Sequence, residues 1–196
     1  MSFVQQVLGA DGHALWADPE WRRQPHLLVG AAENLRARLE VDKIAAVVAA
    51  AARDGGRHFL VVRAGAGDRE TADELRRALA QRVPSYDELL ELARTATLRI
   101  TGIAKYHDPC MQLLREVFDG FGERASVNMY LSPAGSDPGL PLHYDDHEIF
   151  AVQVAGSKRW SLWTPKPDHL AEAFAAFTGE VPDGATPADM EFEVAQ

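Results

Sequence analysis

The segment HYDDHE, residues 143–148, gathers two histidines, two aspartates and a glutamate directly before an apolar stretch. Such a density of charge beside a buried sheet costs free energy unless a counter-ion neutralises it, and a divalent metal ion would do so. Side chains two positions apart on a strand point to the same face, so His143 and Asp145 can hold one cation together. With a histidine from elsewhere they would form a facial triad, which leaves positions of an octahedral Fe(II) open for a co-substrate and dioxygen. A His-x-Asp pair is also common by chance at protein surfaces, so the spacing alone leaves both interpretations open.

A third residue of the same parity, His147, would share that face if the strand were straight. The strongly polar run DDHE favours a turn or a bulge before the apolar stretch resumes. We therefore expect His147 near the metal or at the rim of the site, and not as a ligand. Asp146 and Glu148 have the opposite parity and are expected to be solvated or paired with basic residues.

Three further residues are candidates for binding a small ligand. Lys158 shares its strand face with Trp160 and Leu162, which are expected in the core, so its ammonium group either points inward to an anionic partner or reaches back to water. Asn128 and Tyr130 share one face of an earlier strand and either line a pocket or are ordinary sheet residues.

The first hundred residues are predicted to be mainly helical. Ser85 and Glu88 have the spacing of a capping box, which starts a helix. Asp108 is predicted to cap a helix that has a proline in its first position and ends at Gly120. Helices are expected over 32–56, 68–84, 86–96 and 109–119, and strands over 58–65 and 97–103.

After residue 124 short strands replace the helices. Glycine and proline punctuate the chain, which indicates loops at 134–141 and 181–190. One helix is expected over 169–179. Strands are expected over 125–133, 150–154, 158–163 and 191–196. A helical first part followed by closely spaced antiparallel strands predicts an α+β fold.

Composition limits the class of protein. The chain has 196 residues, of which 46% are hydrophobic, enough for a real core. Its net charge of −9 argues against a dedicated nucleic-acid or anionic-membrane binder. The single cysteine, Cys110, excludes an intramolecular disulfide framework and a zinc site built on several thiolates. No signal peptide or membrane-spanning run is recognisable, so we expect a cytoplasmic protein without direct contact to nucleic acid or membrane.

The segment GLPLHYDDHEIFAVQVAGSKRWSLWTP resembles the core of the Jumonji-C-type, cupin-like oxygenases, most closely the ribosomal oxygenase branch. Weaker similarity extends upstream to SVNMYLSPAGS and to ADPEWRRQPHLLVG near the start of the chain. The features that carry the resemblance fall in order with tight spacing: His143, Asp145, Glu148, Phe150, the run 152–154, Gly156, Lys158 and Trp160.

The resemblance implies a double-stranded β-helix, the cupin or jelly-roll fold, with a helical N-terminal region. Residues 1–96 would form that helical region, and 97–196 the first part of the β-helix. By position, His143 and Asp145 would bind Fe(II), and Lys158 would pair with the distal carboxylate of 2-oxoglutarate. Asn128 and Tyr130 would lie in the co-substrate or substrate pocket. The implied activity is 2-oxoglutarate-dependent hydroxylation of a protein or peptide side chain, with a ribosomal protein as a candidate substrate.

The family's third iron ligand is a histidine in a downstream segment that this sequence does not show. His169 does not match that motif. We therefore expect either a fragment or a natural short form, whose open sheet edge is compatible with a homo-oligomer. Besides an oxygenase, two alternatives stay open at this point: a non-catalytic cupin-like relic or interaction module, and a cupin-type binder or isomerase of a small molecule.

Overall fold

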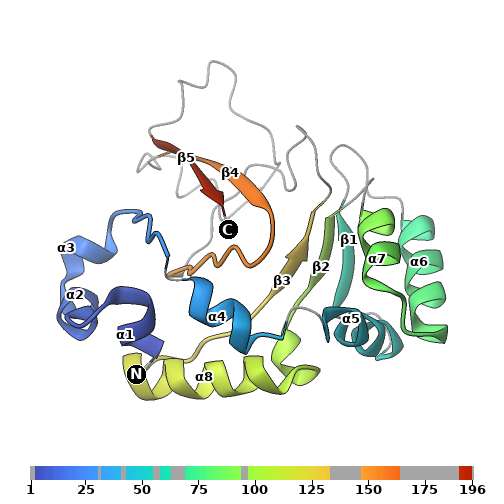
Figure 1. The fold of residues 1–196 in the computed structure, drawn as a ribbon, viewed down its shortest axis with the longest axis horizontal. Helices are drawn as coiled ribbons and strands as arrows, with labels where there is room; N and C mark the ends of the chain where they lie inside the picture. The colour runs from blue at the N-terminus through green and yellow to red at the C-terminus, as the bar shows by residue number, and fades with distance from the viewer. Residues whose placement is uncertain are drawn as a thin grey trace, which may run out of the picture. The chain divides into compact units, whose positions relative to one another are not determined.

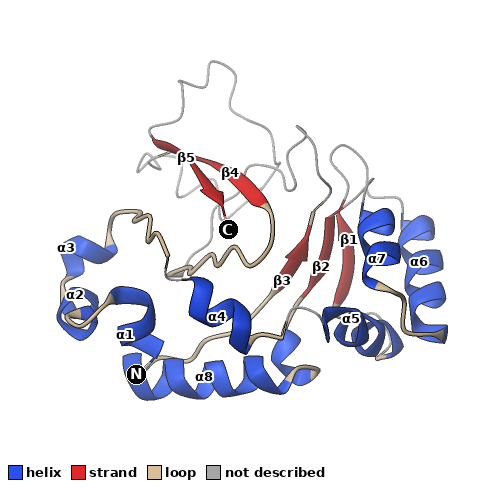
Figure 2. Ribbon diagram, in the orientation of Figure 1, coloured by secondary structure: helices blue, strands red, loops and turns tan. Residues whose placement is uncertain are grey.

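The computed structural model describes residues 3–30, 32–40, 43–54, 58–62, 69–93, 97–132, 147–163 and 190–195 (Figure 1). The chain divides into two compact units, Met1–Leu140 and Pro141–Gln196. Helices and small sheets are mixed, in agreement with the predicted α+β class (Figure 2). The first unit extends past residue 96, because the strand over 97–100 pairs with the strand over 59–62. The predicted boundary at 96/97 and the double-stranded β-helix stay predictions.

The N-terminal unit contains most of the described helices. None of the helices in the described ranges is both long and apolar enough to cross a bilayer. The helices are α1 (Phe3–Leu8), α2 (Gly12–Ala17), α3 (Pro19–Arg22), α4 (Ala32–Arg38), α5 (Ile44–Arg53), α6 (Arg69–Gln81), α7 (Tyr86–Ala93), the 3-10 helix η2 (Ile103–Lys105) and α8 (Asp108–Phe121).

The capping box at the start of α7 is confirmed. Glu88 N donates to Ser85 Oγ at 3.2 Å, and Ser85 N donates to Glu88 Oε2 at 2.7 Å. Both bonds use backbone N–H groups that have no partner within the helix. Arg82 adds a bidentate contact to the same carboxylate. The start of α7 is thus determined by residues close together in sequence.

We expect Glu88→Gln to weaken the loss of stability in acid. The pKa of Glu88 is lowered from 4.5 to about 2, first by the hydrogen bond from Arg82 and then by the bond from Ser85 N. Since the folded pKa is depressed, the carboxylate stabilises the fold above its unfolded pKa, and this contribution disappears as the pH falls toward about 2. Thermal unfolding of both proteins at pH 7 and pH 3 measures the effect. Equal losses in the two proteins would contradict it.

The single helix predicted over 32–56 is wrong, because α4 and α5 are separate helices. Glu40 lies between them with a φ of 45°, in the left-handed region that a right-handed helix cannot contain. Lys43 Nζ contacts Glu40 Oε1 at 2.7 Å, and Lys43 N donates to Glu40 O at 2.8 Å. The chain therefore makes a local turn before α5 begins. Gly55 and Gly56 lie outside the described residues.

Both predicted ends of α8 are displaced. His107, with an extended backbone, holds the cap position, and Asp108 is the first helical residue. At the other end the helix passes through Gly120 and stops at Gly122, whose φ is 73° and whose N–H donates to Phe118 O at 2.8 Å. Gly120 is needed for another reason, because a Cβ there would collide with Val4 of α1. Close packing thus requires the first glycine, and the left-handed cap uses the second.

Three antiparallel strands form a sheet in the order β1 (Phe59–Val62), β2 (Thr97–Ile100) and β3 (Met129–Leu131) (Figure 2). β2 and β3 are shorter than predicted, and β2 ends at Ile100, two residues before Gly102, whose φ is 62°. Leu98 and Ile100 are fully buried on the core face, which packs against residues of α5 and α8. The core includes Val47, Val48, Ala51, Ala52, Phe59, Leu79, Leu89, Leu98, Ile100, Ile103 and Cys110.

The C-terminal unit contains a two-stranded antiparallel sheet of β4 (Ser157–Leu162) and β5 (Met190–Ala195), which confirms the last two predicted strands. The strand predicted over 150–154 is wrong, because no strand is assigned there. A strand needs a neighbour that accepts and donates its backbone hydrogen bonds, and no described strand pairs with this segment. Val152, within this segment, is 37% exposed. The predicted helix over 169–179 and the predicted loops lie outside the described residues, apart from Met190.

Candidate functional site

In β4, Lys158 lies on the same strand face as Trp160, as the sequence predicted. Exposure alternates along the start of the strand, with Lys158 and Trp160 half-buried and Arg159 exposed. Lys158 Nζ lies 5.3 Å from the centroid of the Trp160 ring, a cation–π geometry. Burial lowers the pKa of Lys158, because the ammonium form loses hydration. A half-buried, partly dehydrated ammonium group is well suited to bind a carboxylate.

The other residues of the predicted metal region are only partly described. His143 and Asp145 lie outside the described residues, so their role as ligands stays a prediction. His147 is exposed and lies in a bend, which agrees with the turn expected before the apolar stretch. Across the described ranges no group of three His, Cys, Asp or Glu side chains is placed to hold a metal.

Asn128 and Tyr130 lie beside the three-stranded sheet of the N-terminal unit. Val127 and Met129 pack against the core, so their neighbours Asn128 and Tyr130 point away from it, and both are exposed. Asn128 Oδ1 accepts a hydrogen bond from Gly102 N at 3.1 Å. The predicted alternation along this strand is therefore confirmed, and the pocket beside it stays a prediction.

Arg99 is a candidate that the sequence analysis missed. It is the cross-strand neighbour of Tyr130, and its Cζ lies 5.6 Å from the centroid of the Tyr130 ring. Its Nε is buried and finds no hydrogen-bond partner among the described residues. A guanidinium group is always charged, and a buried donor without an acceptor is costly. Arg99 is thus prepared to donate to an oxygen of a ligand or of another part of the protein.

Beside Arg99 the same side of the sheet carries a hydroxyl pair. Thr97 Oγ1 and Ser132 Oγ lie 3.2 Å apart, and Thr97 is buried. We call Thr97, Arg99, Asn128, Tyr130 and Ser132 the polar sheet face. In sequence, the signal for Arg99 was a charged residue between two apolar strand residues. Strand register was needed to show that Tyr130 lies opposite.

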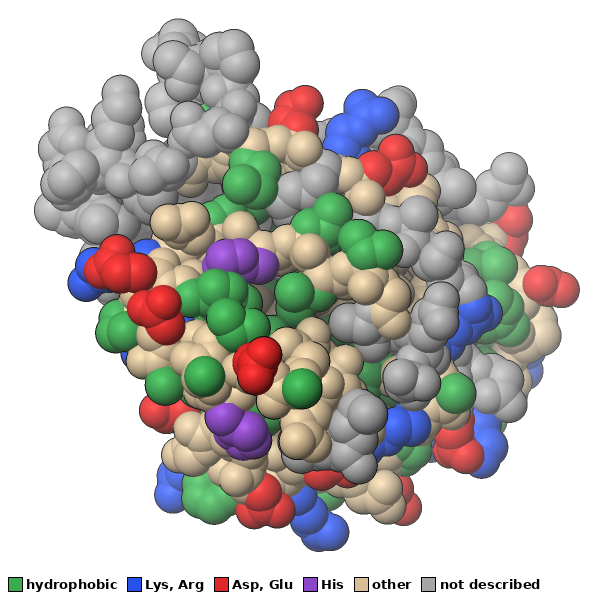
Figure 3. Space-filling view, turned by 60° about the vertical axis from the view of Figure 1, so that its left-hand side comes forward, with side chains coloured by type: hydrophobic (Ala, Val, Ile, Leu, Met, Phe, Trp, Pro, Cys, Tyr) green, Lys and Arg blue, Asp and Glu red, His purple; other side chains and the backbone are tan. Residues whose placement is uncertain are grey.

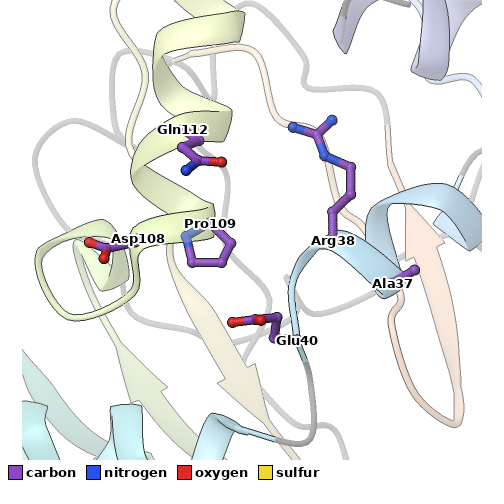
Figure 4. A pocket seen from close by; sticks show the side chains of 6 residues that line it. All are labelled: Ala37, Arg38, Glu40, Asp108, Pro109 and Gln112. Carbon is purple, nitrogen blue, oxygen red and sulfur yellow. The ribbon is translucent and has the colours of Figure 1, made fainter.

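A cavity of about 470 Å³ lies elsewhere in the same unit, between α4 and the first turn of α8 (Figure 4). Arg38 and Glu40 are the charged residues that line the cavity on the side of α4. Arg38 already donates to Gln6 and Glu116, at 2.7 and 2.6 Å, and Glu40 is paired with Lys43. These charges are largely compensated within the protein, so the cavity is a weaker candidate than the polar sheet face.

The buried Cys110 is not suited to be a nucleophile. His107 Nδ1 lies 3.2 Å from Cys110 Sγ, which at first suggests a Cys–His pair. Burial raises the pKa of the Cys110 thiol to about 11 and lowers the pKa of His107. Both groups are therefore neutral near pH 7, and the thiolate that a nucleophile requires is absent. The pair belongs to the core beneath α8.

One face of the molecule shows how the types of side chain are distributed. On the face drawn in Figure 3, hydrophobic side chains reach the surface among both acidic and basic ones. The most exposed large hydrophobic side chain in the described residues is Val29, at 89%.

Residues 105–191 match the JmjC domain family. The mouse protein "Ribosomal oxygenase 2" is 38% identical over 72 residues, which are 37% of this chain and 15% of that protein. The chicken protein "Ribosomal oxygenase 1" is 30% identical over 123 residues, 63% of this chain and 19% of that protein.

The fruit-fly protein "Bifunctional lysine-specific demethylase and histidyl-hydroxylase NO66", from Drosophila sechellia, is 34% identical over 107 residues. That match covers 54% of this chain and 15% of the fly protein. The chain thus spans less than a fifth of the length of these three relatives. No solved structure gives a significant match. Residues 105–191 are therefore similar to the JmjC domain family, and the relatives that the chain matches include proteins named ribosomal oxygenases.

Proposed function

We propose that this protein is a 2-oxoglutarate- and Fe(II)-dependent oxygenase that hydroxylates a side chain of a protein or peptide. The observation that carries the proposal is Lys158. Its half-buried ammonium group lies on β4, inside the segment that matches the JmjC domain and 15 positions after His143. Burial removes part of the hydration of this ammonium group and lowers its pKa, and such a group is suited to bind a carboxylate. We also propose that residues 97–196 form the first part of a double-stranded β-helix.

His143 and Asp145 would hold the iron, because an imidazole and a carboxylate are two of the three donors of a facial triad. When bound, Fe(II) would activate dioxygen, so that one oxygen atom oxidises 2-oxoglutarate to succinate and CO2 and the other is inserted into a C–H bond of the substrate. The chain's own residues would bind the iron and 2-oxoglutarate and orient the substrate. Lys158 would neutralise the distal carboxylate of 2-oxoglutarate, and His147 would lie at the rim.

On the polar sheet face, Asn128 and Tyr130 would contact the co-substrate or the substrate. Arg99 is added to them, because its Nε has no hydrogen-bond partner among the described residues and favours a ligand that carries acceptor oxygens. A carboxylate and a peptide carbonyl both meet that requirement.

The partner we propose is a basic protein or peptide, with a ribosomal protein as the first candidate. The net charge of −9 would speed the encounter with a basic substrate. Relatives with "ribosomal oxygenase" in their names motivate the choice. A cytoplasmic location and a homo-oligomer belong to the same proposal.

The alternative is a non-catalytic interaction module that keeps part of the family fold. One observation favours it: the apolar segment 149–154 has no strand partner in the described ranges and leaves Ile149 and Val152 exposed. Such an edge is suited to pair with another chain. This alternative predicts binding of a partner without any turnover of 2-oxoglutarate.

Incubation of the protein with Fe(II), 2-oxoglutarate and a mixture of ribosomal proteins distinguishes the oxygenase from the non-catalytic interaction module. We expect succinate to form and one protein to gain the mass of one oxygen atom, only when all components are present. An oxygenated product without added 2-oxoglutarate would contradict the proposal. Stable binding of a ribosomal protein without succinate or mass gain would favour the interaction module.

A further inference from the structure

Gly102 makes an unusual link between β2 and β3. The amides on both sides of it donate to backbone carbonyls: Thr101 N to His58 O, and Ile103 N to Val127 O, each at 2.9 Å. Gly102 N instead donates to the side chain of Asn128, at 3.1 Å. The Asn128 side chain therefore takes the place of a backbone acceptor just beyond the end of β2.

This bond determines how the amide of Asn128 is turned. Because Gly102 N is a donor, the atom that faces it must be the carbonyl oxygen Oδ1. The Nδ2 group, which carries two N–H donors, then points to the other side of the amide. Asn128 is exposed, and Nδ2 bonds to no acceptor in the described part of the chain.

The backbone of Gly102 suits this task for a conformational reason. Its φ and ψ are 62° and 40°, in the left-handed region. A Cβ added there would meet His58 Nδ1 only at 3.9 Å, so space alone does not exclude a side chain. Glycine is favoured because residues with a Cβ are strained in this conformation. The turn aims the N–H at Asn128.

We propose that Gly102 is a positioning residue, whose N–H holds the amide of Asn128 so that Nδ2 donates to an acceptor oxygen of the bound ligand. This inference rests on the proposed function, since it assigns a ligand to the polar sheet face. Arg99, whose Nε bonds to no acceptor within the described ranges, supplies a second donor on the same face. Two donors select a ligand that presents a carboxylate or carbonyl oxygen.

Amide hydrogen exchange tests the positioning without any ligand or turnover. We expect Gly102 N–H to exchange slowly in the wild type and in Asn128→Asp, whose carboxylate still accepts the bond. In Asn128→Ala the exchange should be at least about tenfold faster, because the acceptor is gone. Equal exchange in wild type and Asn128→Ala would overturn the assignment.

Steady-state kinetics test what the Nδ2 donor does. Asn128→Asp keeps the bond to Gly102 but removes the donor, so we expect a KM increase of about tenfold or more, as for loss of a bond to a charged group. If only the KM for 2-oxoglutarate increases, its carboxylate is the acceptor of the Nδ2 hydrogen bond. An increase confined to the peptide identifies a peptide carbonyl. No change in either KM would overturn the donor role.

Two glycines provide a matched control for backbone strain. Gly102→Ala and Gly122→Ala both place a Cβ on a residue with positive φ, 62° and 73°, in the same unit. We expect both to lower the unfolding temperature, but only Gly102→Ala to raise the KM that Asn128→Asp raises. Gly102→Asn should have a smaller effect than Gly102→Ala on both the unfolding temperature and the KM, because asparagine tolerates this conformation. An equal KM increase in Gly122→Ala would overturn the positioning role.

The experiments distinguish failure of the proposed function from failure of the role assigned to Gly102 and Asn128. A wild-type protein that forms no succinate would overturn the proposed function, and the ligand role of Asn128 with it. The exchange measurement would still show whether Gly102 orients Asn128. Normal turnover with unchanged KM in Asn128→Asp would overturn this inference and leave the proposed function standing.

Discussion

Replacing His143 or Asp145 with alanine is expected to lower succinate formation from 2-oxoglutarate by more than about 100-fold, since loss even of a group that only supports a metal ligand costs about 10–100-fold. Each variant removes one proposed donor to Fe(II), and the remaining residue cannot hold the ion in a fixed geometry alone. The measurement is the initial rate of succinate formation with added Fe(II).

Asp146→Ala is the matched control for these two variants. Asp146 carries the same charge as Asp145 and is adjacent in sequence, but its parity along an extended chain is opposite. We expect it to keep most of the wild-type rate. Equal rates in the wild type, His143→Ala and Asp145→Ala would exclude both residues as metal ligands.

The second large effect is expected at Lys158. Lys158→Met should raise the KM for 2-oxoglutarate by about 10–100-fold, the effect of losing a hydrogen bond to a charged group. The unfolding temperature should fall only slightly, because methionine keeps an apolar stem beside Trp160 although the cation–π contact of the ammonium group is lost. A merely structural lysine would give the opposite pattern, with lower stability and an unchanged KM.

The pH dependence adds an independent check on Lys158. Burial lowers its pKa, so the ammonium group loses its proton at a lower pH than a free lysine. Binding of the co-substrate carboxylate needs the protonated form. The KM of the wild type should therefore rise as the pH increases toward that lowered pKa, and the KM of Lys158→Met should not follow. Parallel pH profiles would contradict the anchoring role.

Structure that depends on neighbours in sequence was predictable. Ser85 and Glu88 form the capping box their spacing indicates, and β4 and β5 lie where alternation placed them. In each case the residues that decide the outcome lie within a few positions of one another or on one face of one strand.

Structure that depends on distant partners was not predictable from local patterns. Alternation over 150–154 indicated a strand, but a strand exists only where a second one pairs with it. Likewise, α8 contains Gly120 and is followed by Gly122, and only the structure shows that Gly120 packs closely against Val4 of α1 while Gly122 takes the left-handed cap. The left-handed backbone of Glu40 has no sequence signal of the kind that glycine provides.

The candidate site divides in the same way. The sequence drew attention to Lys158, Asn128 and Tyr130, and strand alternation correctly put Lys158 on one face with Trp160, and Asn128 on one side with Tyr130. Arg99 became visible only through its cross-strand pairing with Tyr130. Gly102 became visible only through the hydrogen bond that it donates across the gap between β2 and β3.

The most direct test of the central claim is a crystal structure of the protein with Mn(II) in place of Fe(II) and with 2-oxoglutarate, collected so that manganese can be located by anomalous scattering. We predict one manganese ion bound by His143 and Asp145, and a carboxylate of 2-oxoglutarate against Lys158 Nζ. Manganese bound at other residues, or 2-oxoglutarate bound away from Lys158, would contradict the oxygenase centre proposed for this protein.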